Sequence, residues 1–143
     1  MLDGTAPMAF VATVDLDRSL PFYRDTLGLA VVAADPYGAM LELGGAPVRI
    51  NVVADHTPAP NTVFGFATDD VAAEVAALTA RGVEMARYPG MDQDELGVWT
   101  APDGAQVAWF ADPDGNVVSL TGRQSNRLGS DETVADGGGA NPM

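Results

Sequence analysis

Few side chains in this sequence could carry out chemistry, and the missing residue types already exclude several mechanisms. The 143 residues include one histidine, no cysteine and no lysine, so all seven basic residues are arginines. Disulfides, thiolate nucleophiles, cysteine-ligated zinc, Schiff bases and a phosphate-binding Walker lysine are therefore excluded. The single histidine, His56, is a weak candidate for acid–base catalysis, and Tyr88 and Glu95 are the others. Because His56 lies in a proline-rich connection, an exposed histidine without a catalytic role is the alternative.

Polar anchors for a ligand are concentrated in residues 48–52. Arg49 and Asn51 alternate with apolar residues there, so both should project from the same face of a strand. An arginine on that face could bind a carboxylate or phosphate through its forked guanidinium, or stack on an aromatic ring. The alternative is a strand-edge arginine that faces water.

Aromatic and acidic side chains provide further candidates in the second half of the chain. Trp99 and Trp109 could form walls for a planar ligand. Phe110 must face the opposite side from Trp109, so one of these two neighbours belongs to the core. Residues 88–99 form a connection longer than a minimal hairpin, as binding loops and lids often are. The carboxylates of this connection could meet a cationic ligand or could form a solvated acidic loop; they belong to Asp92, Asp94 and Glu95.

The charge and apolar content of the chain exclude two classes of partner. Twenty acidic residues against seven basic ones give a net charge of −13. Nucleic acids and anionic membrane surfaces both require basic protein surfaces, so neither is an expected partner. No apolar run approaches the ~18 residues of a membrane span, and the N-terminus lacks the layout of a signal peptide. We therefore expect a soluble, cytoplasmic protein.

The elements that must position these residues form two similar halves. Residues 8–15 and 62–69 are similar apolar runs at an offset of 54, and each ends in an aspartate suited to cap a helix. Apolar residues then recur at helical spacing as far as Gly28 in one half and Gly82 in the other. Short strands bounded by turn residues follow, at 29–35, 39–45 and 48–55, and at 83–89, 98–104, 105–115 and 116–122. In each half a strand and a helix are followed by short strands, and this repeated pattern predicts an α+β fold of two paired βαβββ modules.

This pattern predicts a single domain over residues 1–123. Module one covers about residues 5–56 and module two about residues 60–123. Residues 124–143 are rich in Gly, Asp and Ser and have no periodic apolar pattern, so we expect a mobile acidic tail there.

Three segments carry a resemblance to a known family. They are DLDRSLPFYRDTLGL at 15–29, DDVAAEVAALTARGVE at 69–84 and FADPDGNVVSL at 110–120. Together they resemble the vicinal oxygen chelate superfamily, which includes glyoxalase I, extradiol dioxygenases, and fosfomycin- and bleomycin-resistance proteins. The resemblance covers nearly all of residues 8–122 and implies a curved sheet around a central cavity. The motifs are specific for the fold but indicate little about function, because proteins with this fold have many different activities.

Metal-using members of the superfamily place four His, Glu or Gln ligands on the first and last strands of the two modules. The resemblance assigns these places to Met8, to Val63 or Thr62, to Ser119, and to one of Arg49, Ile50 and Asn51. None of these is a strong ligand for a divalent metal, and arginine would add positive charge where the cation should sit. We therefore expect a metal-free protein with no cofactor. The alternative is a shifted site that uses His56 with Asp55 or Glu42.

Strand alternation assigns neighbours to these positions if they still face the cavity. Met8, Phe10 and Ala12 would share one face, and Val63, Gly65 and Ala67 would share another, joined by Val117 and Ser119. This mostly apolar lining, with small residues that leave room, suits an organic ligand, although side chains that fill the space are the alternative. The ligand-binding candidates are Met8, Phe10, Arg49, Asn51, Val63, Trp99, Trp109 and Ser119.

The leading hypothesis is a metal-free protein that binds a small, partly hydrophobic organic molecule. Sequestration, as in the drug-binding resistance relatives, or sensing would be its task, and the resemblance implies a homodimer. The rival hypothesis is an enzyme, a glyoxalase-like lyase or isomerase or a dioxygenase type, with a relocated or absent metal. It would need His56, Tyr88 or Glu95 inside the cavity. A third hypothesis is an accessory partner protein with a collapsed pocket.

Overall fold

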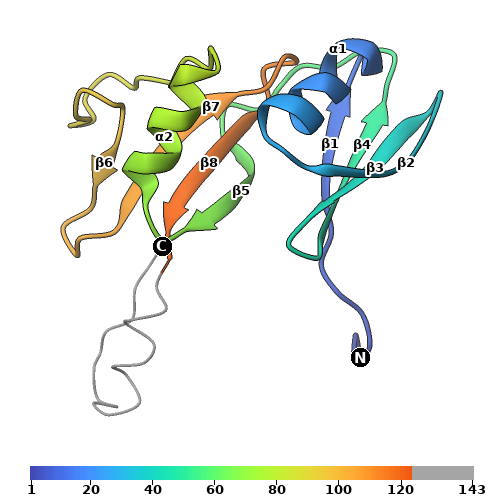
Figure 1. Ribbon diagram of the computed structural model, residues 1–143, viewed down its shortest axis with the longest axis horizontal. Coiled ribbons are helices and arrows are strands. Elements are labelled where there is room, and N and C mark those ends of the chain that lie inside the picture. The colour runs from blue at the N-terminus through green and yellow to red at the C-terminus, as the bar shows by residue number, and fades with distance from the viewer. Residues whose placement is uncertain (124–143) are drawn as a thin grey trace. The chain divides into compact units, whose positions relative to one another are not determined.

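The computed structural model describes residues 1–123 and repeats one arrangement twice (Figure 1). In the first half, β1 (Ala9–Thr13) leads to α1 (Leu16–Pro21), η1 (Phe22–Thr26), β2 (Ala30–Asp35), β3 (Gly38–Leu43) and β4 (Ala46–Val52). In the second half, β5 (Thr62–Thr68) leads to α2 (Val71–Ala80), β6 (Trp99–Thr100), β7 (Gln106–Ala111) and β8 (Val117–Gly122). The sheets have the strand orders β1-β4-β3-β2 and β5-β8-β7-β6. The predicted α+β fold of two βαβββ modules is confirmed.

Two compact units divide the chain, and they do not coincide with its two halves. Unit 1 consists of Met1–Phe64 with Ala111–Val118, and unit 2 of Gly65–Phe110 with the described residues from Ser119 on. The turn between β7 and β8 thus belongs to unit 1, where its side chains bond to β1 and α1. Among the described residues, no helix is long and apolar enough to cross a bilayer.

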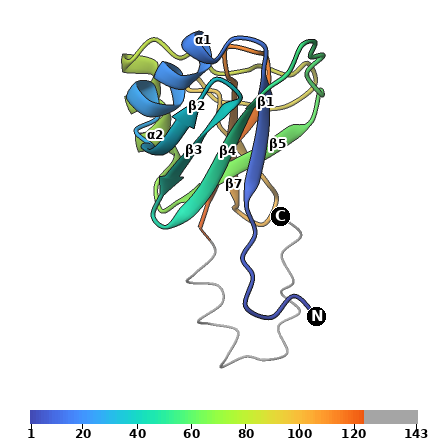
Figure 2. The same ribbon diagram turned by 90° about the vertical axis from the view of Figure 1, so that its right-hand side faces the viewer.

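The sheet of unit 1 has one buried face. β4 lies between β1, to which it is parallel, and β3, to which it is antiparallel (Figure 2). Val11, Leu41, Val48 and Ile50 alternate along these strands and are almost completely buried, and α1 packs on β4. Strand β2 forms the edge of the sheet, and all its residues are exposed. Alternation therefore sends every second side chain of β1, β3 and β4 to the opposite face.

The helix predicted between Asp15 and Gly28 is present but changes type in its middle. It is an α-helix up to Pro21 and a π-helix from Phe22 on, where the Leu27 N–H donates to the Phe22 carbonyl at 2.9 Å. Proline has no N–H for the i−4 carbonyl, and its ring crowds that carbonyl. The backbone hydrogen bonds of the helix therefore change from the i−4 to the i−5 spacing directly after Pro21.

The strand predicted over residues 83–89 is wrong. That segment forms one isolated bridge, Met85 with Phe110, and the Ala86 N–H donates to the Trp109 carbonyl at 2.7 Å. Beyond this point Arg87 and Gln93 bond within the following connection, so the chain leaves the sheet. β6 is correspondingly short, with two residues.

A buried carboxylate holds the β7–β8 turn in unit 1. The Tyr23 hydroxyl donates to Asp112 Oδ2 at 2.6 Å, and the Asn116 side-chain amide donates to the same oxygen at 2.9 Å. The backbone N–H groups of Asp114 and Asn116 donate to Asp112 Oδ1, each at 2.9 Å. Asn116 also donates to the Ala12 carbonyl. Burial, reinforced by the Asp112 carboxylate, raises the pKa of the Tyr23 hydroxyl above its ordinary value.

A second carboxylate of the same turn binds the start of α1. The Asp114 side chain is 2% exposed and accepts from the Thr13 hydroxyl at 2.6 Å and from the Val14 N–H at 3.1 Å. Arg18 donates to it at 2.8 Å. The turn is thus bound to both β1 and α1 by charge-assisted hydrogen bonds.

Replacing Tyr23 tests this network. Tyr23→Phe should lower the free energy of unfolding at pH 7 by about 1–3 kcal/mol, because Asp112 loses a buried donor. The wild-type advantage should shrink above about pH 10, where tyrosine ionises in the unfolded chain. The raised folded-state pKa keeps Tyr23 protonated in the native protein, so ionisation favours unfolding. Urea unfolding at pH 7 and pH 11 measures both effects.

Tyr37→Phe is the matched control, because Tyr37 is 78% exposed. It should leave the unfolding free energy unchanged. An equal difference between wild type and Tyr23→Phe at both pH values would contradict the assignment.

Candidate functional site

The first candidate site is the face of the unit 1 sheet opposite its core. Phe10 of β1 pairs in register with Arg49 of β4, and Ala12 pairs with Asn51. Phe10 is 55% exposed, whereas Arg49 and Asn51 are half-buried. We call this surface, which also carries Met40 of β3, the Arg49 face. The predicted sharing of a face by Arg49 and Asn51 is confirmed, and their role in ligand binding stays a prediction.

Arg49 is held by two neighbours on this face. Its Nε donates to Asn51 Oδ1 at 2.9 Å. Its guanidinium lies over Gly38, because a Cβ placed on Gly38 would be 2.9 Å from Arg49 Nη2. Within residues 1–123, Arg49 forms no ion pair with a side-chain carboxylate. A half-buried cation without a protein carboxylate favours the approach of an anion.

An aromatic group occupies one face of the unit 2 sheet. The Trp109 ring meets Tyr88 edge-on with centroids 5.4 Å apart, and it lies 6.5 Å from Trp99. Trp99 pairs with Val107, two residues before Trp109, so both tryptophans project from the same side. Phe110 projects from the other side and is 1% exposed. Phe110 is therefore the core residue of the Trp109–Phe110 pair, and both tryptophans are half-buried.

The remaining predicted ligand-binding residues, Ser119, Val63 and Met8, differ in their exposure to solvent. A Cβ placed on Gly65 would overlap the Ser119 hydroxyl, so this hydroxyl fills the space above Gly65. The room expected beside that glycine is thus occupied by a nearly buried serine. Val63 of β5 and Met8, just before β1, both remain more than one-third exposed.

The connection over residues 88–98 is braced by its own hydrogen bonds. The Gln93 side chain accepts from the Tyr88 N–H at 2.8 Å and donates to the carbonyls of Ala86 and Gly97 at 2.9 Å. Asp94 Oδ1 accepts from the backbone N–H groups of Leu96 and Val98. This carboxylate therefore stabilises the loop itself. Sequence reasoning missed Gln93, since nothing in the local pattern distinguishes it from a solvated glutamine.

Arg87 braces the same connection from its other side. Its Nη1 and Nη2 donate to the carbonyls of Asp94 and Glu95, both at 2.6 Å. The Glu95 side chain is exposed, and so is that of Asp92. Tyr88, the other weak catalytic candidate of unit 2, is half-buried against Trp109.

His56 belongs to unit 1 and is bonded to the β7–β8 turn. Its Nε2 lies 2.7 Å from Asn116 Oδ1. The Asn116 amide nitrogen donates to Ala12 and Asp112, so its oxygen faces the histidine and Nε2 carries the proton. His56 therefore has a defined structural contact, which leaves Nδ1 as its basic atom.

The residues at the ligand positions of metal-using relatives do not fit a metal ion. Met8 offers a thioether and Ser119 a hydroxyl, and neither is a strong ligand for a divalent metal. The other two places, held by Val63 or Thr62 and by one of Arg49, Ile50 and Asn51, offer no carboxylate or imidazole either. Over the described part of the chain, no three His, Asp or Glu side chains lie close enough to hold a metal.

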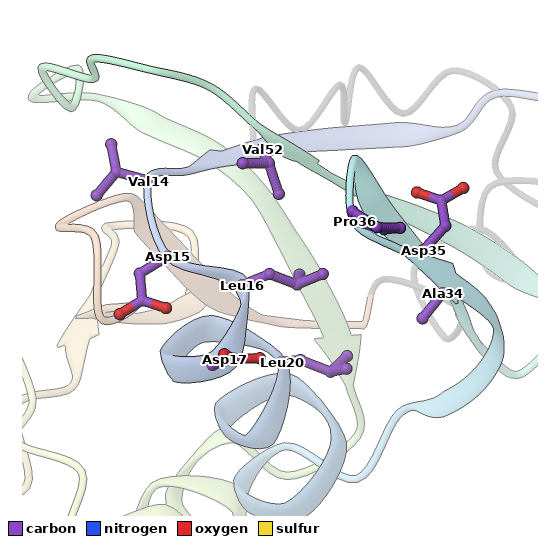
Figure 3. Close-up of a pocket in the computed structure, with 9 residues that line it drawn as sticks. All are labelled: Val14, Asp15, Leu16, Asp17, Leu20, Ala34, Asp35, Pro36 and Val52. Carbon is purple, nitrogen blue, oxygen red and sulfur yellow. The ribbon is translucent and has the colours of Figure 1, made fainter.

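A pocket of about 570 Å³ lies elsewhere in unit 1. Figure 3 shows Leu16 and Leu20 extending into it from α1, with Val52 and Pro36 on the strand side. The carboxylates along it belong to Asp15, Asp17 and Asp35. Its apolar floor and acidic residues suit an uncharged or cationic molecule. Sequence reasoning missed this pocket because its walls come from segments distant in the chain.

Comparison with known proteins gives the family and the fold. A family model described as the Glyoxalase/Bleomycin resistance protein/Dioxygenase superfamily matches residues 5–120. No curated protein matches this chain.

Solved structures share this fold at low identity. One is lactoylglutathione lyase from Agrobacterium tumefaciens, with 20% identity and a TM-score of 0.66 over 85% of this chain and 96% of that one. A glyoxalase family protein from Bacillus anthracis has 18% identity and a TM-score of 0.63 over 86% and 99%. TioX from Micromonospora sp. ML1 has 18% identity and a TM-score of 0.63 over 82% and 98%. Likeness at this level concerns the fold alone.

Removing the Gln93 side chain should loosen the connection that it braces. In Gln93→Ala, the Tyr88 amide should exchange its hydrogen about tenfold faster, which corresponds to about 1.4 kcal/mol of lost local stability. Tryptophan emission should shift to the red as Tyr88 moves from Trp109. Hydrogen exchange and fluorescence measure the two effects.

Gln106→Ala provides the matched control, because that side chain makes one long hydrogen bond, 3.5 Å to Thr100. Exchange at Tyr88 should be unchanged in this variant. Unchanged exchange in Gln93→Ala would show that the loop is held by other contacts.

Proposed function

Since the chain belongs to the Glyoxalase/Bleomycin resistance protein/Dioxygenase superfamily, we propose that it binds a small, partly hydrophobic organic molecule without a metal ion. Its task in this proposal is sequestration, carried out by a cytoplasmic homodimer. The observation that carries the proposal is the exchange of side chains at the positions of the family's metal ligands. Apolar and weakly coordinating side chains stand there, on sheet faces that expose apolar surface.

Exposed apolar side chains support a binding role for the Arg49 face. Phe10 of β1 is 55% exposed and Met8, just before β1, is 39% exposed, whereas Val11 of the same strand is buried in the core. Covering apolar surface contributes roughly 25 cal/mol for each Å² removed from water. An organic molecule that covers this surface would therefore bind with a favourable hydrophobic free energy.

The aromatic group of unit 2 supports the same proposal. Tyr88, Trp99 and Trp109 are half-buried and lie in contact with one another, so their rings are already ordered. Rigid aromatic surface binds planar molecules with little loss of side-chain entropy. The hydrogen bond between His56 and Asn116 favours a binding role over turnover, because it gives the histidine a structural role.

A neutral apolar probe tests binding. The purified protein should bind 2-naphthalenemethanol, measured by isothermal titration calorimetry. Phe10→Ser should weaken this binding about tenfold, or about 1.4 kcal/mol, because an exposed aromatic contact is lost. Tyr37→Ser is the matched control, since Tyr37 is an exposed aromatic residue outside the Arg49 face. It should leave the affinity unchanged.

Native mass spectrometry and elemental analysis test the rest of the proposal. Freshly purified protein should contain no stoichiometric metal, and its mass should correspond to two chains. Stoichiometric zinc, nickel, manganese or iron would contradict the metal-free assignment. Failure of the neutral probe to bind, together with the absence of any co-purified organic molecule, would contradict the binding function.

A further inference from the structure

We infer that Arg49 makes the Arg49 face selective for organic anions, namely molecules in which a carboxylate is attached to an apolar or aromatic body. This inference rests on the proposed binding function and adds the chemical class of the ligand. In this arrangement the ligand's carboxylate accepts hydrogen bonds from the two terminal nitrogens of the Arg49 guanidinium. The apolar part of the ligand packs against Phe10 and Met40.

The charge of Arg49 is not balanced by a neighbouring carboxylate. Its cross-strand partners are Phe10 on β1 and Met40 on β3, and both are apolar. Glu42 shares the face two positions along β3, but it makes no ion pair with Arg49. A half-buried guanidinium has lost part of its hydration, so an arriving anion gains more from it than from a fully hydrated arginine.

The orientation of the guanidinium determines which edge can bind. An arginine can hold a carboxylate either through Nε and one terminal nitrogen or through its two terminal nitrogens. The first edge is engaged, because Nε already donates to Asn51 Oδ1 at 2.9 Å. Nη2 lies beside Gly38, which has no side chain to cover it; a Cβ there would overlap the Ile50 carbonyl oxygen and lie 2.9 Å from Nη2. The edge formed by Nη1 and Nη2 therefore remains for a bidentate contact.

Asn51 and Gly38 hold the guanidinium ready for this contact. They are paired in register on β4 and β3; Asn51 accepts from Nε, and Gly38 leaves room beside Nη2. An arginine fixed before the ligand arrives loses little further entropy on binding. The same arrangement disfavours cations, which would meet an uncompensated positive charge.

Three naphthalene probes of equal size test the inference. We would titrate the full chain with 2-naphthoate, 2-naphthalenemethanol and 2-naphthylmethylammonium in 0.15 M salt, where the net charge of −13 is screened beyond about 8 Å. The carboxylate should bind at least tenfold more tightly than the alcohol, and the ammonium should bind most weakly. Calorimetry gives all three affinities.

Four variants locate the selectivity. Arg49→Gln should reduce the affinity for 2-naphthoate to that for the alcohol and leave alcohol binding within twofold of wild type. Arg49→Lys should retain part of the preference, because the charge stays and the fork is lost. Asn51→Asp should abolish the preference while Arg49 is still present, because the new carboxylate pairs with it. Arg24→Gln changes the net charge equally at an exposed ion pair and should change nothing.

The outcomes separate this inference from the proposed function. Binding of no probe would contradict the proposed function itself. Equal binding of all three probes would overturn the anion selectivity and leave the binding function standing. A carboxylate preference that survives Arg49→Gln, or that Arg24→Gln reduces equally, would also overturn the assignment. Urea unfolding of each variant confirms that the compared proteins are folded.

Discussion

The buried carboxylate of Asp112 is the constraint on which the rest of unit 1 depends. It accepts hydrogen bonds from Tyr23, from Asn116 and from the backbone of its own turn. A buried charge without partners would be costly, but these four donors satisfy both of its oxygens. They also bind the β7–β8 turn to the first half of the chain. Residues 111–118 therefore complete a unit that residues 1–64 begin.

The same network explains why the recognisable motifs say little about function. Tyr23 belongs to the first motif and Asp112 to the last, and they meet through one 2.6 Å hydrogen bond. Asp114 and Arg18, from the same two motifs, form an ion pair with the carboxylate buried. Substitution at these places would weaken the scaffold whatever molecule it binds. The places that the resemblance gives to metal ligands hold other side chains in this chain, Met8 and Ser119 among them.

One face of the unit 1 sheet packs in the core, and the opposite face is the surface that we propose binds a ligand. Val48 and Ile50 pack into the core, while Arg49 and Asn51 project from the other side of the same strand. Because the period of a strand is two residues, one sequence segment can serve both purposes without compromise. Gly38 belongs to this design, since its missing side chain leaves room for the guanidinium.

The sequence alone determined the features that depend on local periodicity. The two βαβββ modules, the shared face of Arg49 and Asn51, and the opposite orientation of Trp109 and Phe110 all follow from spacing along the chain. Tertiary structure decided which of Trp109 and Phe110 is buried, and it gave His56 a partner in Asn116, sixty positions away. It also determined the three hydrogen bonds of Gln93 and the pocket beside α1. The His56 contact and the pocket join segments that are distant in the chain, and the Gln93 bonds depend on the path of an irregular loop, so no periodic pattern in the sequence encodes them.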